Sequence, residues 1–103
     1  PTVEPLDITP PVPLETPAPA YPDLARRARA EGNVLVEAMI GADGSVHEAR
    51  ILRSASPLLN DAALEAVRRW RYSPARVGAR PVSVSTSVVV TFSRRGLDRG
   101  QTP

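Results

Sequence analysis

The chain has 103 residues, a formal net charge of +2, a single histidine and no cysteine. This length suits one domain. Without cysteine the chain has neither a disulfide framework nor thiol chemistry, and one histidine argues against a zinc site built by the chain itself. No stretch approaches the roughly 20 apolar residues of a membrane-spanning helix. We expect no cofactor and no metal.

Residues 1–20 are rich in proline and carry three acids without any basic residue. Recurring proline with few large apolar residues is typical of an extended polyproline II segment. At about 3.1 Å per residue, such a segment would reach roughly 60 Å. We interpret residues 1–20 as a proline-rich extended linker, with a disordered tail or a ligand of SH3-type domains as the alternatives.

The folded part is expected to span residues 21–95, followed by a polar tail at 96–103. Pro22 and Asp23 suit the first turn of a short helix, because proline needs no amide hydrogen there and an acid favours the positive end of the helix dipole. Gly32 is predicted to end this helix. Twelve Arg against seven acids make residues 21–95 basic, at +5.

Two strands joined by a tight turn are predicted next. The first, Asn33 to Ala42, alternates between apolar and other residues, and the Asp43-Gly44 pair is a strong hairpin signal. The returning strand, Val46 to Ser54, changes phase near its start, which predicts a bulge near His47-Glu48. The face of the first strand that we expect in the core holds Val34, Val36, Ala38 and Ile40.

A second helix is predicted from Asp61 to about Arg71, with Asn60 or a neighbour as its N-cap. Apolar residues at spacings of three and four predict its inner face. These residues are Ala63, Leu64, Val67 and Trp70. Residues 72–81 are expected to be a connection.

Residues 82–93 predict an unusually long strand. At about 3.3 Å per residue, twelve residues would extend roughly 40 Å. One face is polar, mostly serine and threonine. The other face is expected in the core and holds Val82, Val84, Thr86, Val88, Val90 and Phe92.

The order of these elements predicts an α+β two-layer sandwich. The second and third strands are joined by a helix and should run parallel, so a right-handed crossover leaves room for the first strand between them, antiparallel to both. We therefore expect a three-stranded antiparallel/mixed sheet in the spatial order 2-1-3, with both helices on one face. The last and longest strand then forms an edge.

That edge strand carries neither charge nor proline from Val82 to Phe92. Proteins usually protect exposed edges with such residues, because unpaired N–H and C=O groups attract other strands. An unprotected edge favours a partner that adds a strand. The alternatives are an edge covered by the chain's own tail or by a second copy of the domain.

Several short motifs together resemble one family. They are Tyr21-Pro22, Glu31-Gly32, Asp43-Gly44, the block from Ala66 to Pro74 that includes Trp70-Arg71-Tyr72, and the final valine-rich strand. In this order and behind a proline-rich segment, they are similar to the C-terminal domain of TonB, the periplasmic energy-transducing protein of Gram-negative bacteria.

The resemblance implies a binding module rather than an enzyme. In that family the domain captures the TonB box of an outer-membrane transporter as an added strand, for uptake of siderophore- or vitamin-type nutrients, and the ExbB/ExbD motor engages a membrane anchor, here outside the chain. It implies a periplasmic domain of an inner-membrane-anchored protein. It also implies Tyr21, Trp70 and Tyr72 as core anchors. The pairing strand would be Val84, Ser85, Thr86, Ser87, Val88, Val89, Val90, Thr91 and Phe92.

Three other functions are less well supported by the sequence. The same fold could serve another cell-envelope machine, for motility or signalling, and the domain could form a homodimer. Nucleic-acid binding through the arginine-rich surface lacks aromatic platforms on an open sheet face. Catalysis lacks a recognisable setting, because His47 lies beside a hairpin without a Ser-His-Asp arrangement.

Overall fold

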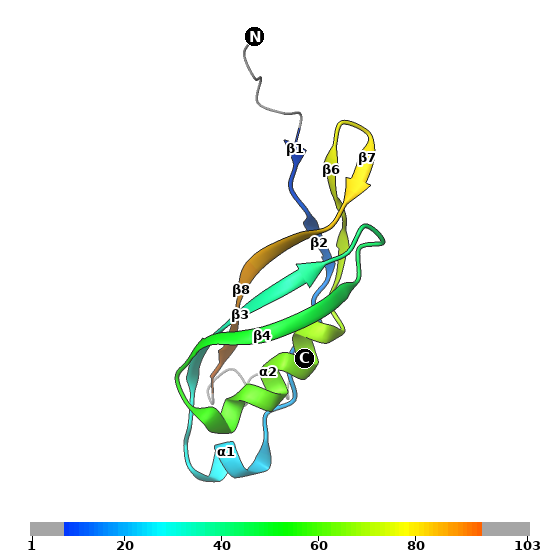
Figure 1. Cartoon of the computed structure of the whole chain (residues 1–103). Coiled ribbons are helices and arrows are strands. Elements are labelled where there is room, and N and C mark those ends of the chain that lie inside the picture. Colours follow the sequence, from blue (N-terminus) through cyan, green and yellow to red (C-terminus); the bar gives the residue numbers. More distant parts are fainter. Residues whose placement is uncertain (1–7, 94–103) are drawn as a thin grey trace.

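The computed structural model describes residues 8–93. Its centre is a sheet of three strands, β3 (Gly32–Ile40), β4 (Val46–Ser54) and β8 (Val84–Phe92), in the order β4-β3-β8 (Figure 1). β3 pairs antiparallel with both neighbours. The predicted α+β class and the spatial order 2-1-3 are therefore confirmed.

The core lies between this sheet and the helices α1 (Asp23–Arg27) and α2 (Asn60–Arg68). Alternate residues of a strand point to one face, and the predicted set on β3 is fully buried. It consists of Val34, Val36, Ala38 and Ile40. Ala25 of α1 and Val67 of α2 join the same core.

The hairpin between β3 and β4 confirms the predicted turn and bulge. Met39 pairs with Glu48 and Ile40 pairs with Val46, so His47 is the extra residue of a bulge. A second shift between Leu35 and Val36, near the other end of β3, was not predicted. The two bulges let β4 keep Val46, Ala49 and Ile51 against the core despite the change of phase, whereas Leu52 is exposed.

The first helix ends earlier than predicted. It stops at Arg27, with Ala28 as its C-cap, and Gly32 already belongs to β3. Arg29 adopts φ 59° and turns the chain, a left-handed conformation that we expected of Gly32. The prediction that Gly32 terminates the helix was wrong.

The start of the second helix also differs. A 3-10 turn, η1 (Pro57–Leu59), precedes it, and Ser56 accepts a hydrogen bond from the amide of Leu58 as the cap of that turn. Asn60 is the first residue of α2, and its neighbour Leu59 is the N-cap, without a capping side-chain hydrogen bond. Ala66 is buried, whereas Leu64 and Trp70 are only half-buried. The helix ends at Arg68, before the predicted Arg71, so Trp70 lies beyond it.

Five short strands flank the central sheet. They are β1 (Ile8–Thr9), β2 (Val12–Glu15), β5 (Arg71–Ser73), β6 (Ala75–Val77) and β7 (Arg80–Val82). β2 pairs with β5, and β1, β6 and β7 form a small sheet at the end of the molecule opposite α1 (Figure 1). We call that end the tip.

These strands change two expectations. Residues 72–81, expected as a connection, form most of β5, β6 and β7. The last strand is shorter than predicted, because β8 begins at Val84 and Val82 belongs to β7, so β8 equals β3 and β4 in length at nine residues each.

The turn before β4 has an acid-sensitive carboxylate. The Asp43 Oδ1 atom accepts hydrogen bonds from the Ser45 amide at 3.0 Å, from the Ser45 hydroxyl at 2.8 Å and faces the His47 imidazole at 3.1 Å. These bonds, the Ser45 amide foremost, hold the pKa of Asp43 well below its usual value. Because this pKa is lowered on folding, the Asp43 carboxylate stabilises the fold at pH values above its unfolded-state pKa of about 4.

We expect this contribution to disappear as the pH falls below about 4 towards the lowered folded-state pKa. Asp43→Asn keeps an acceptor oxygen but does not titrate. The difference in unfolding free energy between wild type and Asp43→Asn should be constant at neutral pH and shrink with acid. Urea denaturation from pH 6 to pH 2 measures it, and a difference that does not change with pH would contradict the expectation.

Candidate partner-binding edge

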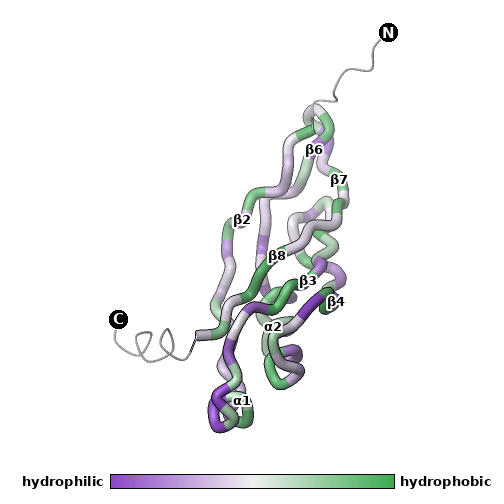
Figure 2. Tube along the Cα trace, turned by 90° about the vertical axis from the view of Figure 1, so that its left-hand side faces the viewer, coloured by the Kyte–Doolittle hydropathy of each residue, from purple (hydrophilic) through white to green (hydrophobic). Residues whose placement is uncertain are grey.

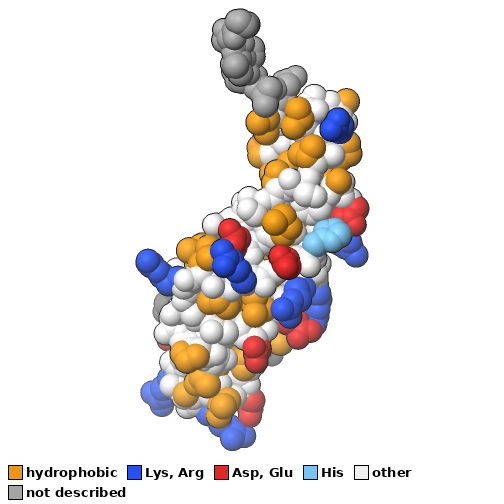
Figure 3. All heavy atoms as spheres, viewed as in Figure 1, with side chains coloured by type: hydrophobic (Ala, Val, Ile, Leu, Met, Phe, Trp, Pro, Cys, Tyr) orange, Lys and Arg blue, Asp and Glu red, His pale blue; other side chains and the backbone are white. Residues whose placement is uncertain are grey.

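The two edges of the central sheet are protected to different degrees. β4 carries charged residues, including Glu48, Arg50 and Arg53, and two bulges. Figure 3 shows charged side chains of both signs across the middle of the face that β4 crosses. β8 has no charge, no proline and an unshifted register with β3. Within residues 8–93, no other strand pairs with β8, so its outer edge is the more open one.

Two hydrogen bonds show which way the main chain of β3 points. The amide of Ala55 donates to the carbonyl of Asn33 at 3.1 Å, and the amide of Gly41 donates to the carbonyl of Ser45 at 2.9 Å. In both bonds an odd-numbered residue, Asn33 in β3 or Gly41 directly after it, directs its main-chain group towards the β4 side. Because main-chain groups of a strand alternate between its two neighbours, the even-numbered residues of β3 bond with β8.

The same alternation divides the residues of β8. The partners of the even-numbered β3 residues are themselves even-numbered, from Val84 to Phe92, and use their main-chain groups on β3. The other four residues direct their N–H and C=O groups to the open edge. They are Ser85, Ser87, Val89 and Thr91. The predicted pairing strand thus contains one set that holds the sheet together and one set available to a partner.

The side chains of these four residues leave the edge clear. They point to the sheet face away from the helices and are exposed, whereas Val90 and Phe92 are buried on the helix side. The Thr91 hydroxyl donates to Asn33 Oδ1 at 2.9 Å. A strand added here would meet main-chain groups at the edge and small, mostly hydroxyl side chains on its flank.

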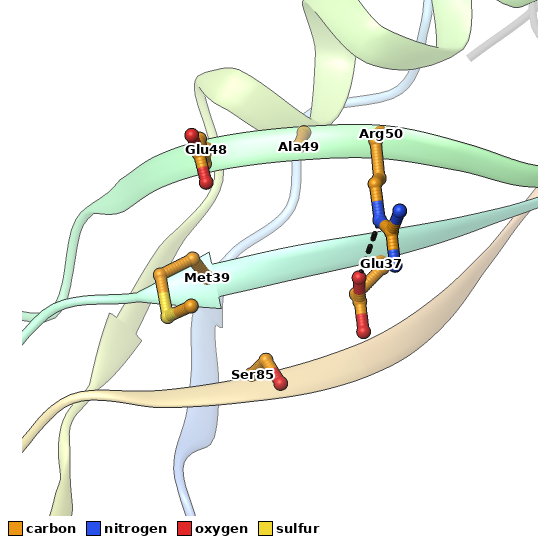
Figure 4. Close-up of a pocket in the computed structure, with 6 residues that line it drawn as sticks. All are labelled: Glu37, Met39, Glu48, Ala49, Arg50 and Ser85. Atoms are coloured by element: carbon orange, nitrogen blue, oxygen red, sulfur yellow. Dashed lines mark hydrogen bonds and ion pairs between the residues drawn. The ribbon is translucent and has the colours of Figure 1, made fainter.

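A shallow hollow of about 310 Å³ lies on that same open face (Figure 4). The hollow reaches β8 at Ser85 and includes the thioether of Met39. Arg50 Nε donates to Glu37 Oε1 at 2.6 Å across β3 and β4. The sequence patterns did not place these residues at the site, although opposite charges at outward positions of two predicted hairpin strands are a recognisable signal.

The three predicted core anchors occupy different environments. Tyr72 is buried, and this burial raises the pKa of its hydroxyl. Tyr21 is half-buried, donates to the carbonyl of Ala30, and meets Phe92 edge-on with ring centroids 5.6 Å apart. Trp70 is half-buried and donates from Nε1 to the carbonyl of Pro17 at 3.1 Å. Trp70 therefore contacts the proline-rich segment as well as the core.

The arginine-rich surface is only partly neutralised. Arg69 Nη2 lies 3.4 Å from Glu65 Oε2 on the outer side of α2, and the Asp23 carboxylate forms ion pairs with Arg26 and Arg27. Other arginines, such as Arg53 and Arg71, have no ion pair within the described residues. The excess of positive charge favours acidic partners at long range.

His47 belongs to the hairpin and not to a nucleophilic relay. Its Nε2 atom lies 3.3 Å from the Ser45 hydroxyl and 3.1 Å from Asp43 Oδ1. A serine relay needs one ring nitrogen for the serine and the other for the acid, whereas here one nitrogen faces both. The cluster therefore stabilises the turn.

The described residues show neither a candidate metal centre nor a membrane-spanning helix. No three His, Asp or Glu side chains of residues 8–93 gather as metal ligands would. No helix in the same range has the length and apolar character needed to span a bilayer.

Residues 17–93 match the family described as Gram-negative bacterial TonB protein C-terminal. The chain is 39% identical over 80 residues to Protein tonB2 of Pseudomonas aeruginosa, which covers 77% of this chain and 30% of that protein. It is 32% identical over 79 residues to Protein TonB of Vibrio cholerae, covering 76% of this chain and 32% of that protein. The chain thus spans about a third of these curated relatives.

A solved structure resembles the fold as well. The solution NMR structure of the Pseudomonas aeruginosa TonB CTD superposes with a TM-score of 0.61 at 30% sequence identity. The alignment covers 84% of this chain and 86% of that chain.

Proposed function

Because this chain belongs to the family of Gram-negative bacterial TonB C-terminal domains, we propose that it captures the TonB box of an outer-membrane transporter as a strand added to β8. The observation that carries the proposal is the uncharged edge on which Ser85, Ser87, Val89 and Thr91 present main-chain groups that no strand among residues 8–93 pairs with. Strand addition uses such groups for affinity and flanking side chains for specificity.

The position of the edge suits a load-bearing contact. β8 is paired along its whole length with β3, the central strand of the sheet, whose core-facing residues Val34, Val36, Ala38 and Ile40 are fully buried. A force applied to an added strand would therefore pass through nine registered residue pairs into the core rather than into a loop. This arrangement supports transmission of force from a proton-driven motor.

The rest of the proposal concerns the parent protein of this domain. We propose an inner-membrane anchor outside the chain, engaged by ExbB and ExbD, and a periplasmic location for the domain. Residues 1–20 would belong to the linker between anchor and domain, and residues 21–95 would form the binding domain. A second copy of the domain is another candidate occupant of the β8 edge.

Binding of a synthetic TonB box peptide tests the proposal. Fluorescence anisotropy of the labelled peptide with the full chain should show saturable binding, and a scrambled peptide of the same composition should not bind. An acidic peptide should bind less tightly as salt rises, because the domain is basic. Equal binding of both peptides would contradict specific capture, and sedimentation of the chain alone would reveal a competing homodimer.

A further inference from the structure

Residues 8–20, which we call the strap, lie against the domain instead of extending away from it. They run from the tip towards α1 (Figures 1 and 2). Ile8 pairs with Val77 of β6, and Val12 pairs with Ser73 of β5. This part of the expected free linker is thus in contact with the segment that leads into β8.

The strand pairing of the strap is weak by itself. All residues of β1 and β2 are exposed, including Ile8, Val12 and Leu14 at 57%, 50% and 65%. Apolar side chains gather at the tip in Figure 3. Pro13 has no amide hydrogen to donate, and the register shifts between Pro13 and Glu15. Little apolar surface is buried, so something else must hold the strap.

Trp70 supplies that contact. Its indole Nε1 donates to the carbonyl of Pro17 at 3.1 Å, although 53 positions separate the two residues. Beside this bond, a groove of about 220 Å³ separates residues 18–22 from the outer side of α2. The small side chains of Ala62 and Ala66 line it, with Glu65 and Arg69 at the polar side.

This combination matches a known way of binding proline-rich peptides. Such peptides keep an extended form, dock onto aromatic surfaces and offer carbonyl groups that lack a partner of their own. Tryptophan suits this task, since its indole has one apolar body and one N–H donor. Alanine side chains allow proline rings to approach the helix.

We propose that Trp70 and the outer side of α2 form a binding site for a proline-rich extended segment, and that residues 17–20 of the chain itself are the segment bound there, held through the Pro17 carbonyl and lining the groove. The site holds the strap on the domain and makes the linker leave at the tip. Without it, the linker would leave beside Tyr21 and α1, at the opposite end of the molecule. Binding at this site does not require strand addition on β8. Only one consequence rests on the proposed function: the site would determine the end of the domain at which the linker applies force.

NMR on the full chain tests this site, because Trp70 is the single tryptophan and gives one indole signal. We expect nuclear Overhauser contacts between the indole ring and Pro17–Ala18. The indole N–H should exchange with water at least about tenfold more slowly than in a chain whose residues 8–20 are replaced by a Gly-Ser sequence of equal length. If that replacement does not fold, Pro17→Gly in the native strap provides the comparison.

A second arm measures the site as a receptor. A free peptide of residues 8–20 should bind the Gly-Ser chain and shift amides of α2, and Trp70→Phe should weaken that binding about fivefold through loss of one hydrogen bond. Absence of the indole contacts in the wild-type chain, or no saturable shift at millimolar peptide, would overturn the proposal. No transporter peptide is used, so the outcome is independent of the β8 edge.

Discussion

Replacing Ser87 by proline is expected to weaken binding of a TonB box peptide at least about tenfold while the domain stays folded. The amide of Ser87 points to the open edge, so proline removes a donor that a partner strand needs and puts its ring in the path of the partner. The bonds between β8 and β3 remain, since their donors belong to even-numbered residues such as Thr86 and Val88. Proline is tolerated on edge strands when its nitrogen faces solvent.

Two matched substitutions separate this effect from others. Ser87→Ala removes the hydroxyl but keeps the amide, and should bind the peptide nearly as well as wild type. Thr86→Pro removes an amide that bonds to β3, and should lower stability. Peptide titrations and thermal melts of all three variants distinguish them. Unchanged binding by a folded Ser87→Pro variant would exclude strand addition at this position.

Gly44→Ala is expected to lower the free energy of unfolding by roughly 2–4 kcal/mol. Gly44 has φ 85°, and an added methyl group would overlap the carbonyl oxygen of Tyr72, a main-chain atom that cannot move aside freely. The amide of Tyr72 also donates to the carbonyl of Gly44 at 2.8 Å. The substitution therefore forces the hairpin away from β5.

Gly78→Ala is the control for this change. Gly78 also has positive φ, at 64°, but no atom lies within 4 Å of an added methyl group. It should cost only about 1 kcal/mol, the price of a left-handed conformation for alanine. Urea denaturation of both variants gives the comparison, and equal losses of stability would show that contact with Tyr72 does not matter.

The sequence predicted the central sheet because its signals are local and regular. Alternating apolar residues from Val34 to Ile40, the Asp43-Gly44 turn and the phase change near His47 each act over a few residues. Chain connectivity then left few arrangements for the three strands. The order and the open edge followed from these features.

The strap and the strip from β5 to β7 could not be predicted in this way. Their strands are two to four residues long, too short for a periodic signal. β2 and β5 pair although more than fifty residues of sequence separate them. Pro13 is as compatible with an extended linker as with an edge strand. Trp70 fits the apolar stripe of the predicted second helix, so no sequence pattern indicated its hydrogen bond to Pro17.

The candidate site was predicted at the level of the strand but not of the residue. Topology placed Val84 to Phe92 at an edge, yet the direction of each amide depends on the register with β3. The bond from Ala55 to Asn33 shows which residues of β3 face β4, and the pairing of β3 with β8 then gives the direction of each amide of β8. Neither is visible in a sequence pattern. The hollow beside Ser85 likewise arises from three strands that meet only in the folded sheet.

Amide hydrogen exchange of the full chain, with and without a TonB box peptide, tests strand addition on β8 most directly. The amides of Ser85, Ser87, Val89 and Thr91 should exchange quickly in the free chain and become protected when peptide is bound. The amides of Thr86, Val88 and Val90 should be protected in both states, because they bond to β3. Protection that arises along β4 or the helices, with the four outward amides unchanged, would contradict the account.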